Sequence, residues 1–435
     1  MSTLPPGPKG PRALHTLGWI TRPGPYAARL RDRYGDTFSL RIANEADWVM
    51  VSHPDAVRQV FTGDPDVLHA GEGNAVLKPL LGPRSVLLLD GADHLSERKA
   101  MLPAFHGERM QAYGELITSI AREEIAGWPA GEVATRPRMQ ELTLEVIMRA
   151  VFGVRDERLR EHVASLLDWT TDPARLLLVL LAGPQRVGRL FKRVRTPVDD
   201  LLTQEIARRR AAPDLDSRDD ILSMLLAHSG MDDATLRDEL ITLLVAGHET
   251  TATALAWALE RLARHPDAWE RLRSQDEDYL DAVVKETLRL RPVVPIVLRL
   301  LKAPMEIAGY QLPAGVAVAP NILLMHTRAD VYPEPRAFRP ERFLETPAGT
   351  YTWIPFGGGV RRCLGASFAI FEMKAVLRAI AAGIGRLEPD RAASERVTRR
   401  AVTLVPARGA RVIAAPRTAT ARPAPPVPTG RSGPT

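Results

Sequence analysis

The sequence predicts one large, mainly α-helical domain with small β-sheets. Amphipathic helical patterns run, with interruptions, from Asp55 to about Leu290, and another runs from about Leu364 to Ala382. Strand-like segments are short and lie in residues 36–54 and in the proline-punctuated part after residue 291. Neither an internal repeat nor a linker divides the chain, so we expect a single domain over residues 1–415.

The two ends of the chain differ from this body in composition. Residues 1–25 are rich in proline and glycine, which predicts an irregular N-terminal arm, and residues 416–435 predict a disordered tail. The N-terminus lacks the apolar core of a secretion signal. The longest apolar run, Leu176–Ala182, is far shorter than the roughly 20 residues of a membrane span. We expect a cytoplasmic protein, although the basic segment after this run could touch a membrane surface.

Charge and cysteine content narrow the functional classes. The net charge is +6, but the eight arginines from Arg396 onward account for the excess, and 50 basic residues face 52 acidic ones elsewhere. This distribution, without a basic stripe bearing aromatic residues, argues against a nucleic-acid partner. Cys363 is the only cysteine, which excludes an internal disulfide and fits a reducing compartment.

Local sequence patterns predict the individual strands and helices. "GDTFSLRI" and "DWVMVSHP" predict two strands joined by a turn at residues 43–47, and "PAGVAVAPNI" predicts another strand. Residues 401–415 predict a terminal hairpin. Four amphipathic segments predict helices: Met110–Trp128, Met139–Phe152, Pro197–Arg210 and Arg218–Ser229.

A long helix is predicted in the middle of the chain. Asp232 or Asp233 can cap its start and Pro266 ends it, so it spans about 33 residues, or roughly 50 Å. Leu240–Gly247 is apolar on all sides, which predicts a buried helix. Gly247 costs about 1 kcal/mol relative to alanine in a helix interior, so we expect a close approach to the backbone there.

Polar residues interrupt this buried helix at "HETT". Burying the Glu249 carboxylate is costly unless it has a partner, water or a function. Two interpretations remain open: a kinked core helix whose threonines bond back to carbonyl groups, or a polar notch that relays protons to a cofactor. A zinc site of the H-E-x-x-H type is excluded because Ala252 stands at the second histidine position.

Cys363 begins the last strong helix, where the helix dipole favours a thiolate. A phosphatase loop would need arginine at the position of Ala369, and "GGGVRRCLG" matches neither a dinucleotide nor a Walker loop. An iron ligand remains, beside the alternative of an ordinary buried cysteine. For an iron ligand, we expect the glycines to let the loop pass close beneath a flat macrocycle.

The cysteine segment resembles the haem loop of the cytochrome P450 family. The family pattern F-x-x-G-x-R-x-C-x-G is matched without a gap by Phe356, Gly359, Arg361, Cys363 and Gly365. "AGHETT" looks like the family's central-helix motif, and "FRPERF" looks like its PERF element. "KETLR" matches its E-x-x-R pair, and "DHLSERKAMLPAF" resembles the helix that supplies His-x-x-x-Arg. These elements occur in the family's order and cover about residues 36–411.

By this resemblance the fold is the family's triangular helical prism around a buried haem b. Cys363 would be the proximal iron ligand, and Glu249 and Thr250 would deliver protons during oxygen activation. The resemblance also implies a structural charge triad of Glu286, Arg289 and Arg342. The residues implied to bind the cofactor are His94, Arg98, Arg299, Arg361, Phe356, Gly357, Gly365 and Ala246.

The resemblance implies a monooxygenase that hydroxylates or epoxidises a small molecule. Apolar segments that match the pocket regions of the family suggest that this molecule is lipophilic. The chain carries no flavin or nicotinamide motif, so we expect electrons from a ferredoxin-type donor with its NAD(P)H reductase. Arg362, Lys374 and Arg378 could meet such an acidic partner, and we expect a monomer. Three alternatives remain: a haem sensor or carrier without turnover, a peroxide-using haem-thiolate enzyme, and a thiol enzyme without haem.

Overall fold

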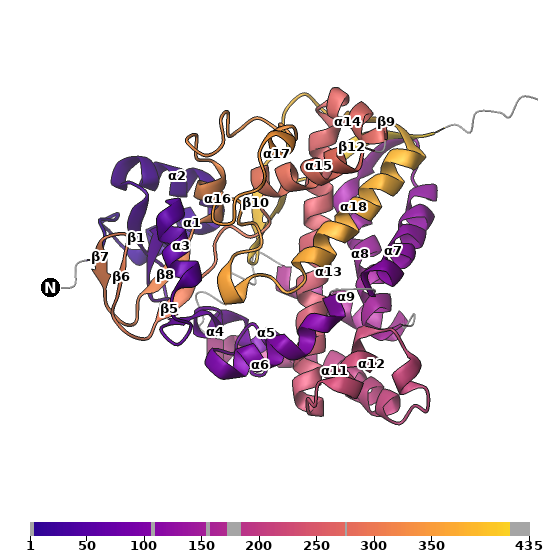
Figure 1. The fold of residues 1–435 in the computed structure, drawn as a ribbon, viewed down its shortest axis with the longest axis horizontal. Coiled ribbons are helices and arrows are strands. Elements are labelled where there is room, and N and C mark those ends of the chain that lie inside the picture. Colours follow the sequence, from indigo (N-terminus) through magenta and orange to yellow (C-terminus); the bar gives the residue numbers. More distant parts are fainter. Residues whose placement is uncertain (1–3, 106–108, 154–156, 172–183, 275, 418–435) are drawn as a thin grey trace, which may run out of the picture.

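The computed structural model describes residues 4–105, 109–153, 157–171, 184–274 and 276–417. They form a helix-rich body with small sheets (Figure 1). The apolar run 176–182 and residues 418–435 of the expected tail lie outside the described residues. Within the described ranges, no helix combines the length and the apolar character needed to cross a membrane.

Two helices open the described chain, so the prediction of an irregular arm over residues 1–25 is wrong. They are α1 (Arg12–Thr21) and α2 (Pro23–Tyr34). Pro11 precedes α1 and Pro23 starts α2, positions where a missing N–H costs nothing because the first turn has no acceptor for it. Trp19 of α1 is buried edge-on against Trp48, which ties these helices to the sheet.

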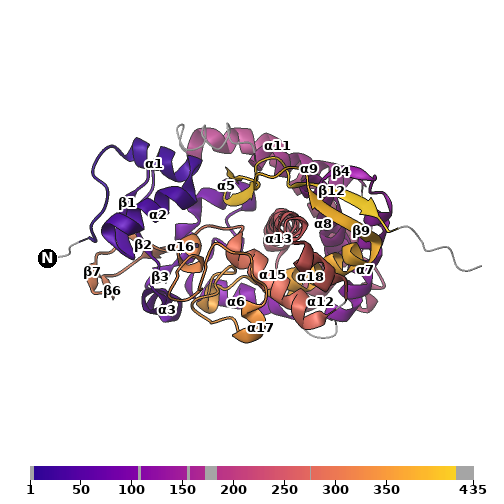
Figure 2. The ribbon, with the colours of Figure 1, turned by 90° about the horizontal axis from the view of Figure 1, so that it is seen from above.

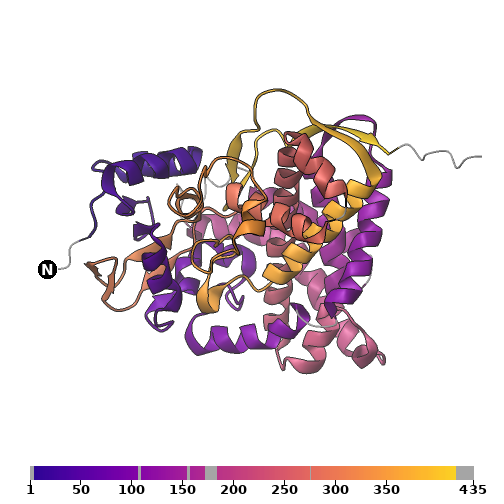
Figure 3. The same ribbon diagram turned by 45° about the horizontal axis from the view of Figure 1, so that its top comes forward.

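The main sheet has the strand order β1-β2-β8-β5-β3. Its first two strands, β1 (Thr37–Arg41) and β2 (Asp47–Val51), confirm the two predicted strands, and they pair antiparallel. β2 then pairs in parallel with β8 (Ala317–Pro320), which confirms the strand predicted there. Figure 3 shows α1, α2 and this sheet on one side of the molecule and the larger helical part on the other.

The helical part is built around α13 (Asp233–Ala263), which Figure 2 shows almost end-on among α8, α15 and α18. Its N-cap is Asp232, which accepts from the backbone of Thr235, so the predicted start is confirmed. The predicted burial of residues 240–247 holds up to Leu244, whereas Ala246 is exposed. A side chain at Gly247 would lie 3.2 Å from Cδ1 of Ile147 on α8 (Thr135–Phe152). The close approach expected at this glycine is therefore the packing of α8.

The other elements complete the two parts. α11 (Pro184–Arg210) begins before its predicted start, Pro197, which lies inside the helix. The remaining helices are α3 (Pro54–Thr62), α4 (Ala70–Gly73), α5 (Lys78–Leu81), α6 (Gly91–Met101), α7 (Arg109–Ala126), α9 (Glu157–Thr171), α12 (Ile221–His228), α14 (Pro266–Arg273), α15 (Glu277–Leu290), α16 (Ile322–His326), α17 (Arg342–Glu345) and α18 (Ala366–Gly383). The remaining strands of the main sheet are β3 (Leu68–His69) and β5 (Arg299–Leu301), and β6 (Met305–Ile307) pairs with β7 (Tyr310–Leu312).

The predicted hairpin over residues 401–415 is wrong. β11 (Thr403–Pro406) pairs with β10 (Val397–Arg400), whereas β12 (Arg411–Pro416) lies between β4 (Gly131–Ala134) and β9 (Ile384–Pro389). Thr135, which follows β4 as the first residue of α8, donates through both its backbone and its hydroxyl to the Ala410 carbonyl. This long-range partner leaves no local pattern in the sequence.

A buried network of charges joins α15 to the segment that leads into the cysteine loop. The Glu286 carboxylate accepts from Arg289 at 2.6 and 2.8 Å and from Nε of Arg342 at 3.2 Å, which confirms the predicted triad. It also accepts from the backbone of Arg339 at 2.8 Å. Arg289 donates further to the carbonyl groups of residues 326, 335 and 337, so one guanidinium fixes three points of the chain.

His326 extends this network toward the cysteine loop. Its Nε2 accepts from the backbone N–H of Ile354 at 2.9 Å, so its Nδ1 carries the proton and donates to the Arg289 carbonyl at 3.1 Å. Complete burial lowers the pKa of His326 to about 3, with the Arg289 charge adding to the effect. The imidazole is neutral and fixed in one tautomer.

We predict that Glu286→Ala lowers the free energy of unfolding by about 3–5 kcal/mol, because it leaves two buried guanidinium groups without their carboxylate. Glu270→Ala, which breaks an exposed pair with Arg273, is the matched control and should change stability by about 0.5 kcal/mol or less. Urea unfolding of the two variants measures both values. Equal losses in the two variants would show that the triad does not hold the fold.

We also predict that His326 makes the protein less stable in acid. Its pKa is about 3 in the fold and about 6.5 in the unfolded chain. Below about pH 6.5 the unfolded chain therefore gains a proton that the fold excludes, and stability falls by about 1.4 kcal/mol per pH unit. The stability difference between wild type and His326→Gln should thus shrink as the pH falls from 7 to 4. His53→Gln, which replaces an exposed histidine, is the matched control.

Candidate active site

The cysteine loop is closed by its own backbone. The N–H of Cys363 donates to the Phe356 carbonyl at 2.9 Å, and the N–H of Gly365 donates to the thiol group. Burial raises the pKa of the Cys363 thiol, whereas the Gly365 N–H and the charges of Arg98 and Arg362 lower it. Burial is the larger effect, so the thiol pKa is raised overall, while the Gly365 N–H and the two arginines partly offset it in favour of the thiolate.

Two glycines of the loop are required by a neighbouring helix. A Cβ at Gly359, where φ is +66°, would lie 2.0 Å from the Phe61 carbonyl of α3, and one at Gly358 would lie 2.1 Å from the Phe61 ring. These two glycines therefore let the loop pack on α3. Gly365 differs, since a Cβ there would meet nothing within 4 Å.

Four basic side chains from three parts of the chain meet near this loop. α6 carries the buried His94 and the half-buried Arg98, β5 begins with the buried Arg299, and Arg361 precedes the cysteine by two residues. Burial and the charges of the three arginines lower the pKa of His94 to about 4. Burial and Arg361 likewise lower the pKa of Arg299 to about 10.

Asp90 is the carboxylate that pairs with this cluster. It contacts Arg361 and also accepts from the backbone of Gly71 and Glu72 at 2.8 and 2.9 Å. Arg361 donates further to the Val86 carbonyl at 3.0 Å. One carboxylate does not balance the charges of the three arginines, so the cluster suits a ligand that brings more than one anionic group.

The middle of α13 opens at the predicted notch. Ala246 is exposed and Thr250 is half-buried in a helix that is otherwise mostly buried, and the Thr250 hydroxyl donates to the Ala246 carbonyl at 2.7 Å. Cys363 is exposed as well, although protein surrounds its thiol closely enough to raise its pKa. α13 thus has accessible surface at Ala246 and Thr250, and the cysteine loop has accessible surface at Cys363. Together with the basic cluster, these surfaces suit a flat cofactor that carries two negative charges, such as haem with its two propionates.

Glu249 lies on a different face of α13 from its neighbour Thr250. Its carboxylate accepts from Nη2 of Arg136 at 2.5 Å and from Nε2 of Gln140 at 2.7 Å, both on α8. Thr253 adds a longer contact at 3.4 Å. The structure thus does not bring the Glu249 carboxylate to the Thr250 hydroxyl. Sequence reasoning missed Arg136 and Gln140, which match no motif.

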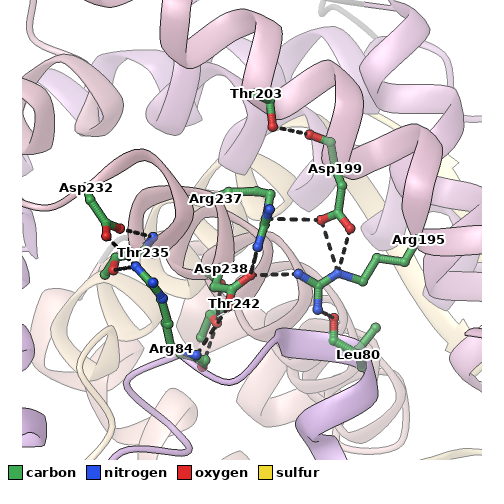
Figure 4. Close-up of polar contacts among 11 residues, drawn as sticks. Leu80, Arg84, Arg195, Asp199, Thr203, Asp232, Thr235, Arg237, Asp238 and Thr242 are labelled. Carbon is green, nitrogen blue, oxygen red and sulfur yellow. Dashed lines mark hydrogen bonds and ion pairs between the residues drawn. The ribbon is translucent and has the colours of Figure 1, made fainter. Parts of the chain in front are cut away.

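The segment before α6 is tethered to the first half of α13 (Figure 4). Asp238 accepts from the Arg84 backbone at 3.2 Å and from Arg195 of α11 at 2.7 Å. Thr242 donates to the Ser85 hydroxyl at 2.7 Å. Because this segment supplies acceptors for Arg361 and leads into His94, the tethers position the basic cluster relative to α13.

Glu239 adds a further tether between the same two elements. The N–H of Val86 donates to its carboxyl group at 2.6 Å, and burial raises the pKa of Glu239 to about 8. This carboxyl group is fully buried, so it holds the backbone of Val86 without adding a charge at neutral pH.

Comparisons with known proteins agree with this geometry. A family model for cytochrome P450 matches residues 5–381. The chain belongs to the cytochrome P450 family. It is therefore a haem-dependent monooxygenase whose cofactor is haem b, held in the P450 fold.

Relatives of known sequence and structure support this assignment along nearly the whole chain. A protein of Mycobacterium tuberculosis named "Putative cytochrome P450 135B1" is 43% identical over 94% of this chain and 91% of its own length. Another from that organism, "Putative cytochrome P450 135A1", is 40% identical over 87% of each chain. A solved structure titled "Retinoic acid bound cyanobacterial CYP120A1" is similar with a TM-score of 0.85 and 26% identity, and the match covers 96% of this chain and 100% of that chain.

Two of the three basic residues expected at a partner surface of this P450 are paired within the chain. Arg378 contacts Glu277 of α15, and Nζ of Lys374 lies 3.8 Å from a Glu277 oxygen and 3.9 Å from Asp281. Arg362 is exposed. A partner that uses Lys374 or Arg378 would have to compete with these acidic side chains.

We predict opposite outcomes for two glycines of the P450 motif. Gly359→Ala should destabilise the cysteine loop even without haem, since its Cβ would collide with α3 at a positive φ. Gly365→Ala should leave the stability of the haem-free protein unchanged. Urea unfolding of the haem-free variants tests this difference.

The haem-loaded variants then separate packing from cofactor binding. If Gly365 contacts haem as its motif position implies, Gly365→Ala should weaken haem retention and the red-shifted CO band of thiolate-ligated iron, despite a stable fold. Unchanged retention and an unchanged band would remove Gly365 from the cofactor site.

Proposed function

We propose that this P450 hydroxylates or epoxidises a lipophilic small molecule, with Cys363 as the iron ligand and electrons from a ferredoxin-type donor and its NAD(P)H reductase. The observation that carries the proposal is the accessible surface of Ala246 and Thr250 on an otherwise buried α13. It leaves a hydroxyl group and a small side chain beside the place where the fold family holds its cofactor.

The surroundings of that surface support a lipophilic substrate. Partly exposed apolar side chains occur on three segments that also carry site residues: Leu87 and Leu88 before α6, Val245 beside Ala246, and Val294 and Val297 before β5. Val297 also lies beside the cysteine loop, 3.5 Å from where a Cβ of Gly357 would stand. The solved relative whose title names retinoic acid, an apolar carboxylic acid, agrees with this class.

The overall reaction fixes what the chain must provide. When bound, haem supplies the activation of dioxygen and the transfer of one oxygen atom. For a substrate RH the balance is RH + O2 + two electrons + two protons giving ROH + H2O. The protein must therefore bind RH, exclude bulk water from it, and deliver two protons.

Residues of this P450 divide these tasks. His94, Arg98, Arg299 and Arg361 would hold the propionates, with Phe356, Gly357 and Gly365 on the cysteine side and Ala246 on the other. Thr250 would pass protons through its hydroxyl, which in the structure donates to the Ala246 carbonyl. Glu249 would supply the protons, and for this its carboxylate must leave Arg136 and Gln140 or act through water.

The proposal of a separate electron donor is supported by residues 1–435, which carry no flavin or nicotinamide motif. Because Lys374 and Arg378 are paired internally, the exposed Arg362 is the better candidate of the three for contact with an acidic donor. Long-range attraction of this kind makes the association rate sensitive to salt.

We predict that Thr250→Ala uncouples electron use from product formation. A panel of lipophilic compounds is first screened by the spin-state shift that binding causes in the haem spectrum. With a binding compound, a ferredoxin and its reductase, the variant should consume NAD(P)H but release most of the electrons as hydrogen peroxide. The physical reason is the loss of the proton-donating hydroxyl, a kind of group that typically contributes about 100-fold or more.

Thr251→Ala is the matched control, since Thr251 is the next residue of α13 and is buried, with its hydroxyl bonded to Glu372 of α18. It should keep its coupling close to that of the wild type. Unchanged coupling in Thr250→Ala would exclude Thr250 from the proton delivery, and a panel without any spin-state shift would contradict the lipophilic substrate class.

A further inference from the structure

Arg399 lies between the first helix and the hairpin of β10 and β11, where α1 and β10 are neighbours (Figure 1). Its Cζ atom lies 5.7 Å from the centre of a ring of Trp19 on α1. Its Nε donates to the Ala401 carbonyl at 2.8 Å, which fixes the guanidinium against the turn of the hairpin. Burial lowers the pKa of Arg399 to about 10, and in the part of the chain that the structure describes no carboxylate pairs with it.

Several hydrogen-bond donors at this place have no acceptor. Among the described residues this applies to Nη1 of Arg399 and to Nε1 of both Trp19 and Trp48, all of them buried. The two tryptophan rings meet edge to face with their centres 6.0 Å apart. The ring of Trp19 attracts the guanidinium charge but offers its N–H groups no acceptor.

Guanidinium and indole N–H groups can only donate, and buried donors without an acceptor are rare because they destabilise a fold. The site therefore combines one uncompensated positive charge with three donors. A carboxylate supplies both the negative charge and the acceptor oxygens that such a site lacks. Arg399 as a whole is half-buried, so part of the side chain remains open to a ligand.

The segment of residues 293–298 connects this site with the proposed substrate surface. It carries Val294 and Val297, two of the partly exposed apolar residues of that surface. The N–H of Leu404, which pairs with Arg399 in the hairpin, donates to the first carbonyl group of the segment at 2.7 Å. The same segment also packs against the buried cluster that contains the two tryptophans.

We propose that Arg399 binds the carboxylate of a lipophilic acid, so that the substrate of this P450 is an apolar carboxylic acid and not a neutral lipophile. Val402, in the turn beside Arg399, is 42% exposed and offers apolar surface for the chain of such an acid. The proposal rests on the proposed function, the oxidation of a lipophilic molecule. It adds the charged group of that molecule and the residue that selects it, and the carboxylate takes no part in the oxidation.

The test compares each acid with its own methyl ester. Retinoic acid, hexadecanoic acid and their methyl esters are titrated into the haem-loaded protein, and the spin-state shift gives the dissociation constants. Arg399→Met should weaken the binding of at least one acid by about 10- to 100-fold, because a hydrogen bond to a charged group is lost. It should change the binding of the corresponding ester by less than about threefold, which also shows that the variant is folded.

Arg400→Met is the matched control, because Arg400 is the next residue of β10, is also half-buried and carries the same charge. Successive side chains of a strand point to opposite faces, so Arg400 lies on the other face of the hairpin. This variant should keep the ratio of acid to ester binding within about twofold of the wild type. Arg399→Lys, which keeps the charge, should retain part of the preference for the acid. Arg399→Gln replaces Arg399→Met if that variant folds poorly.

The outcomes separate this proposal from the proposed function. Equal losses of acid binding in Arg399→Met and Arg400→Met would show that general positive charge attracts the acid, and an unchanged ratio in Arg399→Met would show that Arg399 does not bind it. Either result overturns the proposal and leaves the lipophilic class intact. The same holds if neutral lipophiles of the panel shift the spin state whereas neither acid does. If no compound of the panel shifts it, the lipophilic class of the proposed function fails as well.

Discussion

The buried carboxylate of Glu286 is the contact on which the position of the cysteine loop depends. It accepts from two arginines and a backbone N–H, and Arg289 in turn binds three carbonyl groups of the long irregular segment before the loop. His326 carries the connection to Ile354, two residues before Phe356, whose carbonyl closes the loop on Cys363. This segment has little regular secondary structure and is held in place by charge-assisted hydrogen bonds from side chains. A helix or a sheet would be held by hydrogen bonds between its own backbone groups.

α13 has a second organising role, because its two faces serve different tasks. Its first half holds the segment before α6 through Asp238, Glu239 and Thr242, and its middle exposes Ala246 next to Thr250. Glu249 is turned to α8 and away from that surface. An acid and a hydroxyl group that are adjacent in sequence are therefore separated by the helix itself.

The sequence predicted those parts of the fold that depend on local pattern or on a motif. α13, α18, the first two strands and the Glu286 triad follow from capping, periodicity and motif spacing. The N-terminal helices were missed because their prolines suggested a break, although proline is well tolerated in the first turn of a helix. The pairing of β12 with β4 and the Arg136–Glu249 contact depend on residues far apart in the chain, for which one sequence offers no signal.

The parallel pairing of β2 with β8 has a consequence for the biosynthesis of the protein. About 270 residues separate Trp48 from its partner Ala317, so at about 5–20 residues per second the ribosome needs roughly 15–50 s to produce the partner strand. During that time β2 presents an unpaired edge, which is a site for aggregation or for a chaperone. Cys363 follows later still, so insertion of the cofactor must be among the last events in the maturation of the chain.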